Sequence, residues 1–174
     1  MKRFSAVCIL LLTLCVAAFA QGQDDSLARR LKAAVTQVTS LTADFTQVRE
    51  SHMFSEKLVS NGKMWLYSGK VRWEYVNPVK RVSISDGSRF LKIPESDFGL
   101  NAYEVDSSMD GVRYMLEIKP LRRDMKAMFE VAFLSFDASM GLKGVELRQA
   151  SGDKTVLTFS HVKDGAEIDP SLFQ

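Results

Sequence analysis

Hydrophobic alternation with a period of two is the feature that most limits the fold of this chain. From Leu41 onward, apolar residues such as Leu41, Ala43 and Phe45 alternate with polar residues, and β-branched and aromatic side chains become common. This pattern is typical of strands that bury one face and leave the other in water. We therefore expect a mainly β domain.

Turn signals divide this part of the chain into antiparallel strands. Asp86-Gly87 is the strongest of them, because both central positions of a tight hairpin turn favour residues that tolerate positive φ. Residues 94–111 are polar and poorly periodic, so we expect a long loop there. Residues 121–129 fit either a short helix or a continuing strand. Strands are expected at 56–68, 70–76, 80–85, 88–93, 114–118, 129–137, 142–150 and 154–162.

A single amphipathic helix is expected before the strands, over residues 25–39. Leu27, Leu31 and Val35 recur there at helical spacing, and Asp25 and Ser26 are good N-cap candidates. The apolar stripe of this helix must be covered, and a curved sheet offers the surface for it. The predicted fold class is α+β, with seven to ten strands in one strongly curved sheet and the helix on its concave side.

The first twenty residues resemble a secretory signal peptide. Lys2 and Arg3 precede an apolar run over 7–16, which is too short to span a bilayer, and small residues end the segment at Ala18 and Ala20. We expect cleavage after Ala20, which leaves residues 21–174 as one domain because no internal linker divides them. Both cysteines of the chain lie within the first twenty residues, so the exported domain has no thiol and forms no disulfide.

The charge balance does not favour nucleic acid as a partner. Residues 1–20 hold two basic residues and no acidic one, so after cleavage the 21 acidic residues face an equal number of basic ones. Nucleic-acid binding depends on clustered lysine and arginine. We expect no such cluster and no nucleic acid.

Catalytic and metal-binding motifs are scarce. The chain has two histidines, His52 and His161, and neither has a metal-ligand spacing. The sequence contains no Gly-x-Ser-x-Gly, no phosphate-binding loop and no Gly-x-Gly-x-x-Gly. We therefore expect no enzyme, no metal and no cofactor. The remaining catalytic alternative is a pair of carboxylates brought together by the fold, with candidates Glu74, Asp86, Asp106, Asp110 and Glu117.

Apolar residues occupy both faces of the strand over 64–67, which contains Met64, Trp65, Leu66 and Tyr67. A sheet with one solvated face needs apolar side chains on only one side. Two explanations remain open. Either the sheet is covered on both faces, or one face lines a cavity for an apolar ligand.

The order of several motifs resembles the periplasmic outer-membrane lipoprotein carriers of the LolA family. The motifs are an Ala-x-Phe-x-Gln strand at 43–47, a Gly-x-x-Trp strand at 62–65, an Arg-Trp-x-Tyr segment at 72–75 followed by Asn77-Pro78, and a Ser-Asp-Gly hairpin at 85–87. Each motif is weak alone, and their order and spacing carry the resemblance. The family's Arg-Pro after the tryptophan strand is replaced here by residues 67–70, so we transfer no lid-fastening role to Lys70.

The resemblance implies an unclosed β-barrel, covered by the N-terminal helix and a short lid, that binds the acyl chains of lipoproteins in a hydrophobic cavity. It also implies a monomeric carrier in the periplasm, which receives its cargo from an inner-membrane release complex and passes it to an outer-membrane acceptor. For this function we predict a cavity lined by Phe45, Met64, Leu66, Trp73, Tyr75, Ile84 and Phe90. The alternative function is an envelope protein-binding sensor or assembly module on the same fold, without lipid transport.

Overall fold

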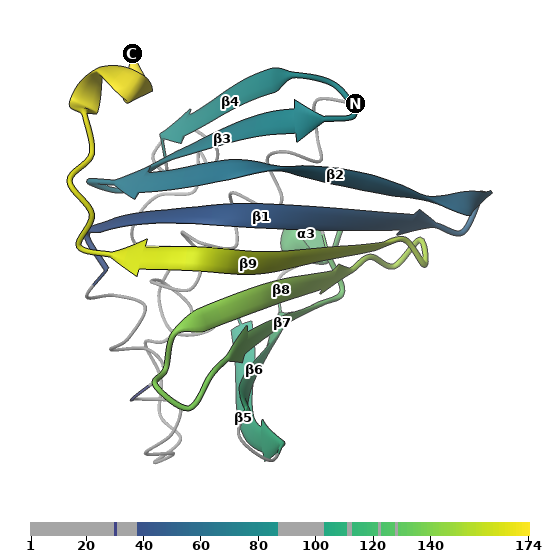
Figure 1. Ribbon diagram of the computed structural model, residues 1–174. Coiled ribbons are helices and arrows are strands. Elements are labelled where there is room, and N and C mark those ends of the chain that lie inside the picture. The colour runs from purple at the N-terminus through teal and green to yellow at the C-terminus, as the bar shows by residue number, and fades with distance from the viewer. Residues whose placement is uncertain (1–29, 31–37, 87–102, 111–112, 122, 128) are drawn as a thin grey trace.

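The computed structural model describes residues 30, 38–86, 103–110, 113–121, 123–127 and 129–174. They form one strongly curved sheet of nine strands (Figure 1). The strands are β1 (Ser40–Ser51), β2 (Phe54–Tyr67), β3 (Lys70–Asn77), β4 (Arg81–Asp86), β5 (Tyr103–Asp110), β6 (Arg113–Pro120), β7 (Val131–Phe136), β8 (Leu142–Arg148) and β9 (Lys154–Asp164).

The strands lie in the order β4-β3-β2-β1-β9-β8-β7-β6-β5, and every neighbouring pair is antiparallel. The pairing of β1 with β9 joins two meanders, which places the first and last strands at the centre of the sheet. Strands β4 and β5 are its two edges, and the described residues do not pair them with each other. The predicted unclosed, mainly β architecture is confirmed.

Helices contribute little to the described part of the chain. The predicted helix over 25–39 lies almost wholly outside it, although Arg30 is helical, and Val38 and Thr39 are not. No lid is identified among the described residues. The segment 121–129 contains α3 (Arg123–Lys126), a single turn, and a 3-10 helix, η2 (Pro170–Phe173), ends the chain. No described helix is long and apolar enough to cross a membrane.

The expected loop over 94–111 is wrong for residues 103–110, which form strand β5. The alternation in its sequence is present but diluted, since apolar residues stand at positions 103, 105 and 109 while serine stands at position 107. The strand is defined by its pairing with β6, in which Tyr103 lies opposite Pro120. The expected strand over 88–93 lies outside the described residues. The other strands begin and end within a few residues of their predicted limits.

One face of the sheet carries the hydrophobic core, and we call it the inner face. The ring centroids of Trp73 in β3 and Phe159 in β9 are 6.3 Å apart. Two strands lie between β3 and β9, so a flat sheet would separate their backbones by roughly 14 Å. The sheet therefore bends toward this face. The buried core residues on it are Ala43, Phe45, Met64, Val71, Trp73, Tyr75, Leu116, Ile118, Ala132, Leu134, Phe136, Val145, Leu147, Leu157 and Phe159, joined by Phe129.

Candidate functional site

The inner face is the candidate site, because it forms a continuous apolar surface across both meanders. None of the residues in its core cluster is more than 6% exposed. The cluster includes residues of β1, β2 and β3 from the first meander and of β6, β7, β8 and β9 from the second. An apolar surface of this extent can cover hydrocarbon. A charged group borders it at Arg81, which pairs with Tyr75 in the register and whose guanidinium carbon lies 4.4 Å from the centroid of the Tyr75 ring.

Aromatic rings define the part of the inner face on β1, β3 and β9. Phe45 meets Trp73 edge to face, with centroids 4.9 Å apart and planes at 79°. Phe45 also meets Tyr75 edge to face, with ring centroids 5.0 Å apart and ring planes at 79°. Phe45 and Tyr75 both lie beside Gly62 in the register of the sheet, one on each side of it. The absence of a side chain at Gly62 lets the backbone of β3 approach closely, because a Cβ there would overlap the Glu74 carbonyl oxygen.

Five of the seven predicted lining residues lie on the inner face. Phe45, Met64, Trp73 and Tyr75 belong to its buried core, and Leu66 packs against that core while half-buried. Their common face follows from the register, which aligns Met64 with both Ala43 and Trp73.

Of the other two predicted residues, the structure describes only Ile84, and it does not join them. Ile84 pairs with Arg72, so it lies on the opposite, outer face of the sheet. Phe90 lies outside the described residues. The sequence could not assign Ile84 to a face, because the three residues between β3 and β4 decide the register.

Several side chains with polar atoms are buried on the inner face. Gln47 is 6% exposed and has a partner. Ser85 is fully buried and Trp73 is 1% exposed. The Ser85 Oγ and the Trp73 Nε1 have no hydrogen-bond partner within the described part of the protein. Trp73 was predicted from the sequence to line the cavity, whereas no role was predicted for Ser85.

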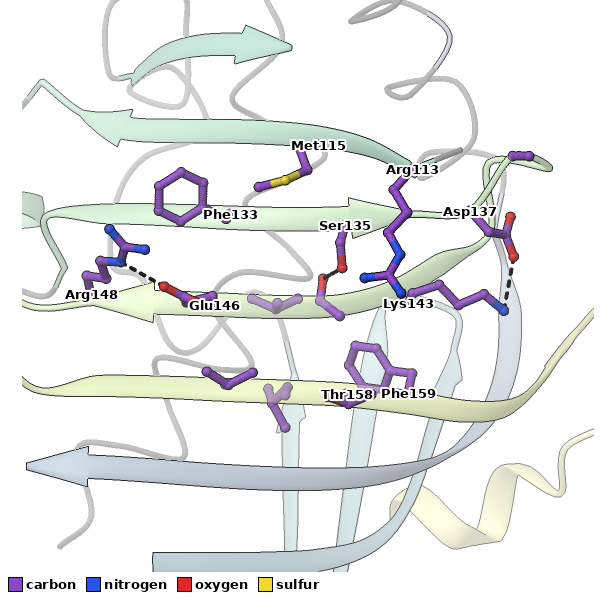
Figure 2. A pocket seen from close by; sticks show the side chains of 15 residues that line it. Arg113, Met115, Phe133, Ser135, Asp137, Lys143, Glu146, Arg148, Thr158 and Phe159 are labelled. Carbon is purple, nitrogen blue, oxygen red and sulfur yellow. Dashed lines mark hydrogen bonds and ion pairs between the residues drawn. The ribbon is translucent and has the colours of Figure 1, made fainter. Parts of the chain in front are cut away.

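The outer face carries a hollow of about 690 Å³ over β6, β7, β8 and β9. Met115 and Phe133 supply its apolar surface, and Arg148 lies 4.8 Å from the centroid of the Phe133 ring. Arg148 also pairs with Glu146 at 2.7 Å. Figure 2 shows these side chains along the strands, together with Arg113 at one end. The hollow combines apolar and charged groups, unlike the inner face.

Asp137 stabilises the turn that borders this hollow. Its carboxylate accepts hydrogen bonds from the Ser139 hydroxyl at 2.6 Å and from the Gly141 N–H at 2.9 Å, and it pairs with Lys143 at 3.0 Å (Figure 2). These hydrogen bonds, that of Ser139 above all, hold the pKa of Asp137 well below its usual value. The carboxylate is therefore a structural anion that closes the β7–β8 turn.

The C-terminal segment is fastened to the outer face near β2 and β3. Arg72 donates a hydrogen bond to the Leu172 carbonyl at 2.8 Å and pairs with Glu74 at 3.1 Å. Its guanidinium carbon lies 5.8 Å from the centroid of the Trp65 ring. Phe173 is buried, and its ring centroid lies 6.1 Å from that of Tyr67. The end of the chain thus covers the outer face of β2 at Tyr67.

The alternative chemistries find little support. No group of three or more metal-ligating side chains occurs among the residues that the structure describes. Of the candidate carboxylates, Asp106 and Glu117 occupy directly opposite register positions on β5 and β6. Glu117 pairs with Lys119 at 2.7 Å, and Glu74 pairs with Arg72. Two of these carboxylates are therefore engaged by neighbouring cations.

Comparison with known proteins agrees with the resemblance. Residues 36–93 match the model of the family described as outer membrane lipoprotein carrier protein LolA. An outer-membrane lipoprotein carrier protein from Chromohalobacter salexigens is 26% identical, over 99% of this chain and 93% of its own length. One from Methylococcus capsulatus is 24% identical, over 95% of this chain and 91% of its own length.

Among solved structures, a LolA superfamily protein from Nitrosomonas europaea matches over 94% of this chain and 96% of its own, with 9% identity and a TM-score of 0.30. This structural likeness is too distant to carry an argument. The family match over 36–93 and the carrier relatives agree with the resemblance drawn from the motifs, at identities of 24–26%.

Proposed function

Since this chain is a divergent relative of the outer-membrane lipoprotein carriers of the LolA family, we propose that it binds the acyl chains of lipoproteins on its inner face and carries them through the periplasm. The observation that supports this proposal most directly is the continuous apolar surface on one face of an unclosed sheet. No bond is made or broken in this function, so the protein is not an enzyme.

The physical requirement is to keep hydrocarbon out of water between two membranes. Each buried methylene group contributes about 0.8 kcal/mol, so an acyl chain of some sixteen carbons would gain more than about 10 kcal/mol by burial. The open edges of the sheet at β4 and β5 let the inner face accept a long guest without passage through a closed wall. A monomer is sufficient for this role.

The transport route is part of the proposal. After removal of residues 1–20, the domain would act in the periplasm, taking lipoproteins from an inner-membrane release complex and delivering them to an outer-membrane acceptor. The names of the relatives support lipoproteins as the cargo class. The two membrane partners are inferred from the family resemblance alone.

A titration with a fluorescent fatty acid tests the proposal, and two of the predicted lining residues provide a matched pair of variants. Leu66 and Ile84 are both half-buried, on the inner and the outer face respectively. We expect the mature protein to bind the probe, Leu66→Ala to weaken binding about tenfold, and Ile84→Ala to leave it within a factor of two. No uptake by the unmodified protein, or an equal loss in both variants, would refute acyl binding on the inner face.

A protein-binding module is the second candidate function, and the outer hollow favours it. This hollow joins Met115 and Phe133 with Arg113 and Arg148, a mixture of apolar and charged groups suited to a polypeptide. A pull-down with one envelope lipoprotein in lipidated and unlipidated form separates the two functions. Capture of the lipidated form alone supports the carrier, whereas equal capture of both forms supports the module.

A further inference from the structure

We propose that the Trp73 indole N–H and the Ser85 hydroxyl donate hydrogen bonds to an acyl carbonyl oxygen of the ligand bound at the inner face. This inference rests on the proposed function and names the polar group that the site recognises. It predicts that the protein prefers acyl esters and amides to hydrocarbon chains of equal length that lack the carbonyl.

The two donors are placed together by the register of β3 and β4. Trp73 lies opposite Ser83, and Val71 lies opposite Ser85, so Trp73 and Ser85 are diagonal neighbours on one face. Diagonal neighbours in an antiparallel pair are about 7–8 Å apart, a span that one oxygen between two side chains can bridge. Val71 and Trp73 belong to the buried core, which fixes that face as the inner one.

Both donors are buried without a partner. Trp73 is 1% exposed and Ser85 is 0% exposed. The Trp73 Nε1 and the Ser85 Oγ have no hydrogen-bond partner within the described part of the protein. Most buried polar groups in proteins are hydrogen-bonded, and one left unpaired is costly. Two such atoms, on diagonally neighbouring residues of one apolar face, indicate a ligand that completes them.

The chemistry of the donors selects the ligand group. An indole N–H can only donate, so its complement must be an acceptor, and a carbonyl oxygen has two lone pairs that can accept from both groups. Trp73 and Ser85 are themselves neutral, so they match a neutral acceptor, whereas a buried carboxylate would also need a buried cation and Arg81, over the Tyr75 ring, is exposed. A neutral ester or amide carbonyl at the head of an acyl chain fits both the donors and the apolar surroundings.

Two lysophospholipids provide a direct test. 1-Palmitoyl-lysophosphatidylcholine and its 1-O-hexadecyl ether have the same headgroup and chain length, and they differ by the carbonyl oxygen. In competition against a fluorescent fatty acid, we expect the full mature protein to bind the ester about tenfold more tightly than the ether. Trp73→Phe and Ser85→Ala should each reduce this ratio toward one, mainly by weakening the ester.

The control variants alter the same residue types on the outer face. Trp65→Phe and Ser135→Ala should keep the ester preference, since Trp65 lies beside Arg72 and the Ser135 hydroxyl bonds to the Gly144 carbonyl. Equal binding of ester and ether by the unmodified protein, or an unchanged ratio in both inner-face variants, would overturn the carbonyl proposal while leaving acyl binding intact. Failure of both lipids to compete would instead refute the proposed function.

A diacylglyceryl-cysteine lipopeptide and its dialkyl counterpart distinguish the source of the carbonyl. If this pair competes at lower concentration than the lysophospholipids and shows the same carbonyl preference, the acceptor belongs to a lipoprotein. The reverse order assigns it to a phospholipid. Both results keep the donor assignment, and absence of a carbonyl preference in both pairs removes it.

Thermal unfolding of the ligand-free protein provides a second measurement, which does not depend on binding. Removal of an unpaired buried hydroxyl relieves a cost, so Ser85→Ala should raise Tm by about 2–4 °C or leave it unchanged. A lower Tm for this variant would mean that the Ser85 hydroxyl is already satisfied within the protein, and it would overturn the proposal.

Discussion

Replacement of Gly62 by alanine should weaken the fold more than any other single added methyl group in β2 or β3. A Cβ atom built at Gly62 overlaps the Glu74 carbonyl oxygen of the neighbouring strand and lies 2.8 Å from the Glu74 carbonyl carbon and 2.9 Å from the Tyr75 Cα. All three atoms are backbone. The strands can relieve the overlap only by moving apart, at the point where their register already shifts between Asn61 and Gly62.

The expected magnitude follows from two effects. Overpacking a core by one methyl group costs about 1–3 kcal/mol, and a clash with main chain belongs at the upper end of that range. Separation of the strands would also loosen the contact between Phe45 and Tyr75, and such aromatic pairs contribute about 0.5–1.5 kcal/mol. We expect Gly62→Ala to lower the free energy of unfolding by about 3 kcal/mol and Tm by about 6–12 °C.

Urea unfolding, followed by circular dichroism, measures this change, and Gly141→Ala is the matched control. At Gly141 the added Cβ would lie 3.3 Å from the carboxylate oxygens of Asp137, a side chain that can move, so we expect a loss below about 1 kcal/mol. The slope of free energy against urea should stay similar in both variants. A loss below about 1 kcal/mol for Gly62→Ala, or equal losses for the two glycines, would refute the reasoning.

Three further predictions test other parts of the structure. Because the folded-state pKa of Asp137 is depressed, its contribution to stability is present above the unfolded pKa of 3.8 and is lost as the pH falls below that value. Asp137→Asn should therefore flatten the acid limb of a curve of unfolding free energy against pH. An unchanged acid limb would contradict this. Arg72→Gln removes the donor to the Leu172 carbonyl, so carboxypeptidase should release the last five residues faster, as followed by mass spectrometry; an unchanged rate argues against this anchor. In urea unfolding, Phe136→Ala should lower the free energy of unfolding by about 3–5 kcal/mol, and Phe133→Ala, on the outer face, should lower it by less than about 2 kcal/mol. Equal losses in the two variants would contradict the assignment of faces.

Much of the fold was predictable because the alternation and the turn residues act locally. The strands around Phe45, Trp73 and Leu157 were all expected close to where they occur. Strand β5 was missed because serine at position 107 interrupts its apolar face, and pairing with β6 along its whole length supplies what its own pattern lacks. The pattern of residues 103–110 alone does not predict that this segment pairs with β6.

The candidate site was predictable in its composition but not in its faces. Leu66 and Trp73 were expected together and lie together, whereas Ile84 was expected with them and lies opposite. A shift of register by one residue moves every side chain of a strand to the other face. The conformation of the β3–β4 turn therefore decides whether Ile84 or Ser85 points inward, and this choice is also what brings the Ser85 hydroxyl beside Trp73.

The apolar residues found on both sides of β2 have a different explanation on each side. On the outer face, Tyr67 meets Phe173 and Trp65 lies beside Arg72, which also bonds the C-terminal segment, so the chain itself covers this surface. On the inner face, Met64 joins a cluster that continues through both meanders. The cover on the outer face is partial, because Val59 of β2 is 55% exposed. Cover on both faces therefore describes much of β2, and acyl binding on the inner face remains the proposal that the fatty-acid titration tests.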